Sequence, residues 1–135
     1  MTPFWFVDTF FFVALLSEGD RAHKRAINVL NGLRSRLLTT EWVLTEVGDA
    51  MADPTDRPKF LALVALLKKH PLVTIMAADG ESFAQGLALY ADRRDKRWSL
   101  TDCISFTVMR VRGLTEALTG DRHFEQAGFT ALLRG

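Results

Sequence analysis

The sequence predicts an α/β protein in which a short, mainly parallel sheet is flanked by helices on both faces. Strand-like apolar runs alternate with stretches of helical periodicity, which is the pattern of strands joined by crossover helices. The 135 residues fit one domain, 1–135, and no repeat or long linker divides them. Hydrophobic residues at 48% and charged residues at 24% are typical of a chain that folds around a core.

Apolar runs rich in β-forming residues place the strands, and apolar residues three and four positions apart place the helices. The charged stretch 91–98 is expected to be a loop. The expected strands cover residues 4–8, 37–39, 72–76, 117–119 and 130–132. The expected helices cover residues 9–16, 22–34, 41–52, 58–69, 79–90 and 99–112.

Capping residues set several of these helix boundaries. Thr40 and Asp79 have side chains that suit an N-cap, and Pro58 suits the first turn of a helix. The segment 99–102, Ser-Leu-Thr-Asp, has the spacing of a capping box. Gly113 suits the end of the helix that this box begins.

The apolar N-terminal segment lacks the features of a signal peptide or a membrane span. No Lys or Arg precedes it, Asp8 interrupts it, and it is shorter than the roughly 20 residues that a spanning helix needs. We therefore expect a cytoplasmic protein with no membrane attachment. The single cysteine, Cys103, excludes an intrachain disulfide and is expected in the core. The net charge is only +1, so affinity for nucleic acid must come from a local patch.

Two acidic residues follow predicted strands. Asp8 ends the most apolar strand, where a carboxylate loses hydration, and Asp121 follows the strand 117–119. In parallel sheets, sites form beyond the carboxyl ends of the strands, where the strand order reverses. Each residue also has a structural interpretation, since Asp8 can cap the next helix and Asp121 can occupy a turn.

Two further acids lie on predicted helices with little polar surface. Glu46 falls inside the apolar arc of its helix, between the directions of Trp42 and Val43, although a side chain at the edge of that arc can reach solvent. Asp102 is explained as the last residue of the capping box, yet the rest of its helix is apolar on nearly every side. We expect both carboxylates to point into the structure.

Four carboxylates near one sheet edge predict a metal site. Converging carboxylates repel one another, and without a counter-charge their pKa values rise. Mg²⁺ is commonly bound by a few carboxylates and several waters, and it removes this repulsion. Two such ions about 3.5–4 Å apart can activate water and stabilise the leaving oxygen in phosphodiester cleavage. The pattern therefore indicates metal-dependent phosphoryl chemistry.

The four acids lie in four distinctive stretches of sequence, namely 6–9 (Phe-Val-Asp-Thr), 39–46, 98–106 and 118–124 (Leu-Thr-Gly-Asp-Arg-His-Phe). Together these stretches resemble the PIN-domain ribonucleases, in particular the VapC-type toxins of toxin–antitoxin pairs. They occur in family order and the resemblance covers roughly residues 4–132. Phe10 departs from the pattern, because many relatives have a small or polar residue two places after the first Asp.

The resemblance implies a Rossmann-like PIN fold and endonucleolytic cleavage of RNA. It implies that Asp8, Glu46, Asp102 and Asp121 form the catalytic metal site for Mg²⁺ or Mn²⁺, with Glu46 as a ligand or as the residue that positions the attacking water. It also implies a homodimer and a small antitoxin protein that blocks the site. No general-base side chain is evident, so the ion is expected to activate the water.

A basic run, 93–98, precedes the helix of Asp102 and combines cations with an aromatic residue. Trp98 is expected to be anchored in the core. The candidate contacts to RNA phosphates are Arg93, Arg94, Lys96 and Arg97. Thr9 is a further candidate for a substrate or water contact, although capping explains it equally well. His123, two residues after Asp121, could face the substrate, but a position on a surface loop is expected.

Two other functions remain open. A phosphatase would use Asp8 as its nucleophile, but that chemistry usually requires a second acid two residues later, where Phe10 stands. A non-catalytic RNA-binding or scaffold protein would keep the fold without turnover, and the presence of all four acids weighs against it. No Gly-rich phosphate loop is present, which argues against an ATPase.

Overall fold

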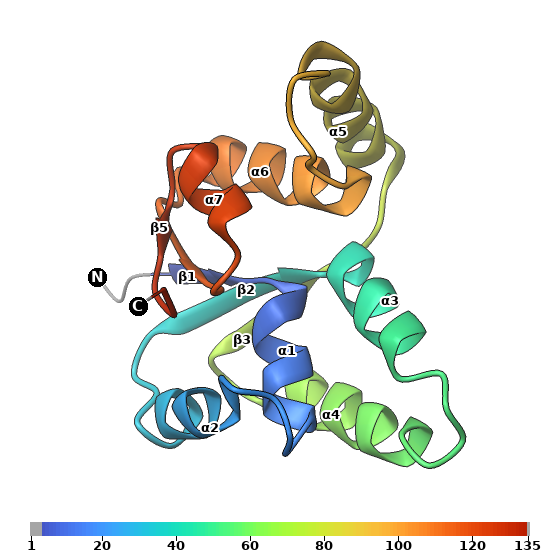
Figure 1. Cartoon of the computed structure of the whole chain (residues 1–135), viewed down its shortest axis with the longest axis vertical. Coiled ribbons are helices and arrows are strands. Elements are labelled where there is room, and N and C mark those ends of the chain that lie inside the picture. The colour runs from blue at the N-terminus through green and yellow to red at the C-terminus, as the bar shows by residue number, and fades with distance from the viewer. Residues whose placement is uncertain (1–3, 135) are drawn as a thin grey trace.

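The computed structural model describes residues 4–134 and shows a five-stranded parallel sheet in the order β3-β2-β1-β4-β5 (Figure 1). The strands are β1 (Phe4–Val7), β2 (Arg36–Thr40), β3 (Val73–Met76), β4 (Glu116–Leu118) and β5 (Thr130–Ala131). The helices are α1 (Thr9–Leu16), α2 (His23–Asn31), α3 (Glu41–Ala50), α4 (Arg57–Lys69), α5 (Gly80–Asp92), α6 (Leu100–Arg112) and α7 (Arg122–Gln126). The predicted fold class is confirmed.

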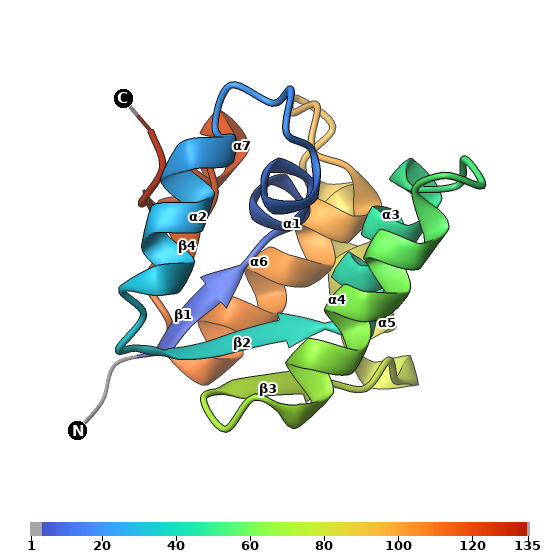
Figure 2. The same cartoon turned by 90° about the horizontal axis from the view of Figure 1, so that it is seen from below.

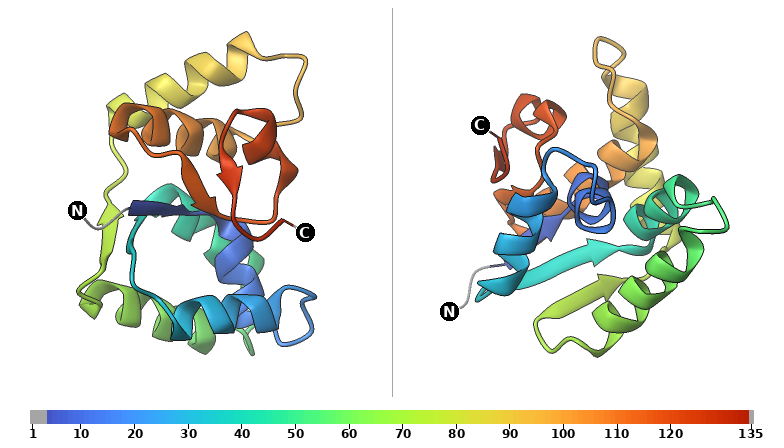
Figure 3. Two further views of the ribbon diagram at one scale, coloured as in Figure 1. Left: turned by 90° about the vertical axis from the view of Figure 1, so that its left-hand side faces the viewer. Right: turned by 60° about the horizontal axis from the view of Figure 1, so that its bottom comes forward.

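Helices cover both faces of this sheet. Helices α6 and α7 lie on one face, and α1, α2 and α4 lie on the other (Figures 1 and 3). Helix α5 packs along α6, while α3 begins where β2 ends and contacts both α1 and α6. Because both faces of the central strand are covered, Phe6 and Val7 are fully buried, which accounts for its continuous apolar sequence.

Aromatic packing fixes α7 against α6 and the sheet. The Phe124 ring of α7 contacts Phe106 of α6 edge-on, with ring centroids 4.9 Å apart, and stacks at 6.4 Å on Phe6 of β1. Cys103 is buried beside this cluster, as predicted. The helix α7 is too short to be stable on its own, and it is therefore stabilised by its packing against the core.

The strand order reverses at β1, which has β2 on one side and β4 on the other. Val7 pairs with Leu118, so the residues that follow the two strands, Asp8 and Thr119, emerge side by side. In Figure 2 the arrowheads of β1 and β2 point toward α1 and α3, which begin at this edge. This carboxyl edge is the place where sites form in open parallel sheets.

The predicted elements differ from the observed ones mainly at their ends. The helix expected over 22–34 covers only His23–Asn31, and α5 extends through Asp92 into the stretch expected to be a loop. Helix α7 was not predicted, because five residues are too few to show helical periodicity. Gly113 ends α6 with φ 69°, as predicted. Within residues 4–134, no helix combines the length and apolarity that crossing a membrane requires.

Candidate active site

Asp8 lies at the carboxyl end of the central strand and is only 3% exposed. It occupies the N-cap position of α1, but its side chain makes no capping hydrogen bond, so the capping interpretation of this carboxylate is wrong. Asp8 Oδ2 instead accepts a hydrogen bond of 3.0 Å from Thr119 Oγ1. The bond joins the ends of two neighbouring strands, β1 and β4.

Thr119 also connects Asp8 to Asp121. The Thr119 hydroxyl oxygen accepts a 3.0 Å hydrogen bond from the Asp121 backbone N–H. Since the hydroxyl has one proton, it donates to Asp8 and accepts from Asp121. Asp121 is the N-cap of α7, where its Oδ1 accepts from the His123 backbone N–H at 2.9 Å. A single hydroxyl thus orients one acid and the backbone of another.

Asp102 approaches the same place from the first turn of α6. The predicted capping box is present: Ser99 Oγ accepts from the Asp102 N–H at 3.0 Å, and Asp102 Oδ2 accepts from the Ser99 N–H at 3.1 Å. The same Oδ2 lies 3.1 Å from His123 Nδ1. The Asp102 carboxylate therefore caps its own helix and also belongs to the acidic cluster.

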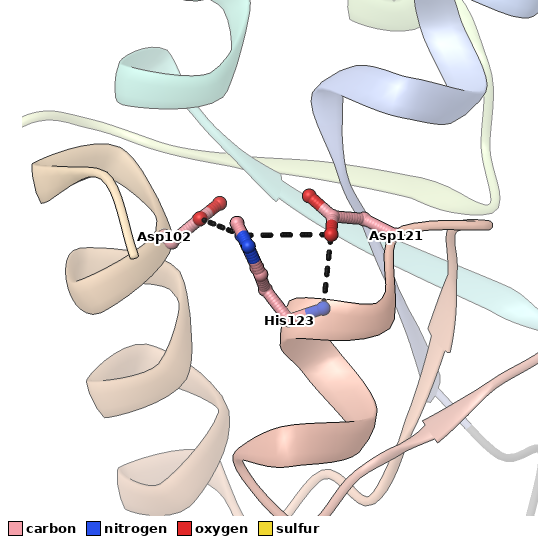
Figure 4. Close-up of side chains that lie close together, drawn as sticks. All are labelled: Asp102, Asp121 and His123. Atoms are coloured by element: carbon pink, nitrogen blue, oxygen red, sulfur yellow. Dashed lines mark hydrogen bonds and ion pairs between the residues drawn. The ribbon is translucent and has the colours of Figure 1, made fainter. Parts of the chain in front are cut away.

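His123 lies between Asp102 and Asp121 (Figure 4). Its Nδ1 is 3.1 Å from Asp102 Oδ2 and 3.5 Å from Asp121 Oδ1. One ligand atom from each of these three residues lies within 4.8 Å of the others. The expectation of a surface loop for His123 is wrong, because the residue is in the first turn of α7 and its side chain is only 21% exposed. The sequence does contain a signal for this position of His123, because the capping preference of Asp121 predicts that a helix starts there.

Glu46 is connected to this cluster through Thr9. The Thr9 Oγ1 donates a hydrogen bond of 2.5 Å to Glu46 Oε1, and Thr9 directly follows Asp8. Glu46 is half-buried on α3 and does not belong to the compact Asp102–Asp121–His123 group. Of the four predicted acids, the structure therefore brings Asp8, Asp102 and Asp121 together and places Glu46 at their border.

Burial and mutual repulsion make the cluster electrostatically unfavourable. Burial, reinforced by the charges of Asp102 and then Asp121, raises the pKa of Asp8 from 3.8 to about 7, against the opposing effect of the Thr119 hydrogen bond. Burial also raises the pKa of Asp102, and the hydrogen bond from His123 partly offsets it. The surroundings thus supply too little positive charge for these carboxylates.

The donor set fits a divalent cation. Carboxylate oxygens are the ligands that Mg²⁺ and Mn²⁺ prefer, and an imidazole nitrogen is also a ligand for transition metals. Asp102, Asp121 and His123 could each offer one atom to the same ion, and Asp8 is linked to them through Thr119. A bound cation would supply the charge that the raised pKa values of Asp8 and Asp102 show to be missing.

Phe10 packs against the backbone that carries Asp121. A Cβ atom at Gly120 would lie 2.5 Å from the Cζ atom of the Phe10 ring, so a side chain at position 120 would force the ring or the turn to shift. The half-buried ring thereby supports the turn between Thr119 and Asp121. The unusual residue at position 10 has a structural role beside the acids, and it adds no polar group to them.

The basic run lies between α5 and α6. Trp98 is buried and its Nε1 donates to Gln126 Oε1 at 3.0 Å, which confirms that it is an anchor in the core. A cleft of about 320 Å³ is lined by all four cations of the run, Arg93, Arg94, Lys96 and Arg97.

Comparison with known proteins identifies a family model, "PIN domain", that matches residues 5–130. The 23S rRNA-specific endonuclease VapC20 from two strains of Mycobacterium tuberculosis is 31% identical over 125 residues, which cover 92% of this chain and 94% of the relative. The crystal structure of the M. tuberculosis VapC20, described as a Sarcin-Ricin loop cleaving toxin, superimposes with a TM-score of 0.82 at 26% identity, covering 92% of this chain and 95% of that one.

More distant solved structures share the fold. FitAcB from Neisseria gonorrhoeae has a TM-score of 0.62 at 20% identity, with 93% of this chain and 94% of that chain covered. VapBC2 from Rickettsia felis, bound to a DNA fragment from its promoter, has a TM-score of 0.67 at 9% identity, with 95% and 96% covered.

Proposed function

The chain belongs to the PIN-domain family, and from that premise we propose that it is a metal-dependent endoribonuclease, the toxin of a VapBC-type toxin–antitoxin pair. The observation that carries the proposal is the cluster of Asp8, Asp102, Asp121 and His123 at the point where the strand order reverses, in which Asp8 and Asp102 are buried. Buried acids whose pKa values are raised, here Asp8 and Asp102, suit a metal-assisted hydrolase.

We propose RNA as the substrate, and 23S rRNA as the first RNA to test. The relative VapC20 acts on 23S rRNA and matches this chain over nearly its full length. Its likeness extends to the three-dimensional structure, since the TM-score is 0.82. The proposal of an RNA target agrees with the basic cleft beside the first turn of α6.

The residues of the cluster have separate tasks in this proposal. Asp102, Asp121 and His123 would hold the cation, and Asp8 would add a further negative charge beside it. When bound, Mg²⁺ or Mn²⁺ would supply Lewis acidity for phosphodiester hydrolysis. Thr119 keeps the Asp8 carboxylate in place, and Thr9 keeps Glu46 at the border, where it would position the attacking water.

The structure supports this function over a phosphatase that uses Asp8 as its nucleophile. Such an enzyme would need an acid two residues after Asp8, and the Phe10 ring fills that place against Gly120. A scaffold without turnover would gain nothing from burying repelling carboxylates, which destabilise the fold.

Three further features follow from the proposed toxin type. We propose that the protein acts in the cytoplasm, forms a homodimer and is inhibited by a cognate antitoxin. The antitoxin is supported by the likeness to VapC20 and by the fold shared with the VapBC2 assembly, and the homodimer and the compartment are what we expect of this toxin type.

The test is cleavage of purified 23S rRNA by the purified protein, with cut sites mapped by primer extension. We expect cuts at few positions when Mn²⁺ or Mg²⁺ is present, none in EDTA, and recovery when metal is added back. Absence of cleavage of 23S rRNA and of total cellular RNA in both metals would contradict the proposal.

A further inference from the structure

A basic cleft of about 320 Å³ opens between the end of α5 and the start of α6. The loop that forms it returns from the far end of α5 to the beginning of α6 (Figure 1). Tyr90, which is 50% exposed, lies on the wall of the cleft together with the four cations of residues 93–97. An exposed aromatic ring next to several cations is the combination that binds unpaired nucleotides, through stacking and phosphate contacts.

The four cations of this cleft are not equivalent. Asp95 pairs with Arg93 at 3.0 Å and with Lys96 at 3.8 Å, and the Arg93 guanidinium also lies over the Trp98 ring, 5.1 Å from its centroid. Arg94 and Arg97 have no ion-pair or hydrogen-bond partner among residues 4–134 and are exposed. Because Asp95 is shared by Arg93 and Lys96, most of the uncompensated positive charge of the cleft lies on Arg94 and Arg97.

The cleft is fixed next to the acidic cluster by two connections. Cys103 lines the cleft, while the preceding residue on the first turn of α6, Asp102, belongs to the cluster. Trp98, at the end of the basic loop, donates its indole N–H to Gln126 of α7, the helix that carries His123. A strand of RNA that passes around the start of α6 can thus contact both sites.

We propose that Arg94 and Arg97 bind consecutive backbone phosphates of an unpaired RNA segment and that a base of this segment stacks on Tyr90. This proposal rests on the proposed ribonuclease function and adds the path by which the substrate leaves the acidic cluster. Arg93 and Lys96 are paired with Asp95 and contribute little to binding.

The test compares two charge-matched double variants of the full chain, Arg94→Gln/Arg97→Gln and Arg93→Gln/Lys96→Gln. Binding of a labelled single-stranded RNA of roughly twelve nucleotides is measured by fluorescence anisotropy in EDTA, which prevents cleavage, over a range of salt concentrations. We expect the first variant to bind at least about tenfold more weakly and its log–log salt slope to fall by about 1.4, since each phosphate contact on a single strand contributes about 0.7.

The second variant serves as the matched control, and we expect its affinity to change by less than about threefold. Tyr90→Ser should weaken binding at least about fivefold at every salt concentration without changing the slope, because stacking releases no counterions. Arg34→Gln/Arg36→Gln, at the opposite end of β2, should bind like the wild type.

Equal losses in both double variants would show that affinity follows net charge alone and would overturn the proposal. Unchanged affinity in Arg94→Gln/Arg97→Gln, or a wild-type protein that does not bind the RNA, would also overturn it, and would leave an acidic protein segment as the ligand that fits the cleft. None of these three results would affect the proposed function, which depends on metal-dependent cleavage of 23S rRNA by the wild type.

Discussion

The acidic cluster and the basic cleft flank the first turn of α6, yet they are built in opposite ways. The cluster is assembled from residues far apart in the sequence, and the hydrogen bond between Thr119 and Asp8 spans 111 positions. The cleft comes almost entirely from one short stretch, residues 90–98. The acids are mostly buried, whereas Arg94, Arg97 and Tyr90 are exposed.

This difference shows what each site requires from a ligand. Buried carboxylates have lost their hydration, so only a cation held within the cluster makes their charges favourable. Exposed arginines keep their hydration and can exchange it for phosphate at little cost. We therefore expect large and metal-dependent effects from changes in the cluster, and moderate, salt-dependent effects from changes in the cleft.

The largest effect is expected from Asp8→Asn. The substitution keeps the shape of the side chain but removes a charge beside the ion, and cleavage of RNA in Mn²⁺ should fall at least about 10³-fold, which corresponds to about 4 kcal/mol of barrier. Cleavage rates measured under single-turnover conditions check this. The matched control is Asp49→Asn, an exposed acid on α3, which should cleave like the wild type. Wild-type rates in the Asp8 variant would show that the cluster is not the catalytic site.

The second effect concerns the pH dependence of stability without metal. The pKa of Asp8 is about 7 in the folded protein, above the ordinary 3.8, so the folded state holds a proton that the unfolded chain releases as the pH rises. The contribution of Asp8 is thus most favourable below about pH 4 and is lost as the pH rises through about 7, by up to about 4 kcal/mol.

Urea unfolding of EDTA-treated protein at about pH 5 and about pH 8 measures the part of this loss that falls above pH 5, about 3 kcal/mol. The loss should be much smaller in Asp8→Asn and unchanged in Arg94→Gln/Arg97→Gln, because the cleft takes no part in it. If wild type and Asp8→Asn lose stability equally, the burial of Asp8 does not govern this titration.

Metal binding should reverse the same destabilisation. At a Mn²⁺ concentration about 100-fold above the dissociation constant, binding to the folded state alone contributes about 2.7 kcal/mol. Melting curves in EDTA and in Mn²⁺ should show this as a rise in Tm, with a smaller rise for Asp121→Asn. The cleft variant Arg94→Gln/Arg97→Gln should keep the full rise, and a loss of the rise there would mean that the two sites are not independent.

The smallest effect is expected from Gly120→Ala, which tests the support of the cluster. The new Cβ would lie 2.5 Å from the Phe10 Cζ, and such overpacking costs about 1–3 kcal/mol of stability. Phe10→Leu should restore much of this loss in the double variant, as urea unfolding would show. If the double variant is no more stable than Gly120→Ala, the Phe10 ring is not what excludes a side chain at position 120.

The fold could be predicted from the sequence because its signals are local. Apolar runs located the five strands, and Thr40, Asp79 and Ser99 accept the capping hydrogen bonds that were expected of them. Helix α7 escaped prediction because its five residues are stabilised by the packing of Phe124 and not by their own pattern.

The site could be predicted only in part. The grouping of Asp8, Asp102 and Asp121 was predicted because acids at strand ends and on an apolar helix were expected to converge at the carboxyl edge of the sheet. The position of His123 beside Asp102 could not be predicted, because it depends on the tertiary contact between α7 and α6. The sequence also could not separate Arg93 from Arg94. The two differ only because the backbone turns Arg93 toward Asp95 and leaves Arg94 unpaired among the described residues.

The long span of the Thr119–Asp8 hydrogen bond has a consequence for the order of events during protein synthesis. β1 emerges from the ribosome early, but its partner β4 and the residues Thr119 and Asp121 emerge more than a hundred positions later. Until then one edge of the central strand is unpaired and two members of the acidic cluster do not yet exist. If the protein cleaves ribosomal RNA as proposed, the nascent chain cannot cleave the RNA of the ribosome that makes it before Asp121 has been synthesised.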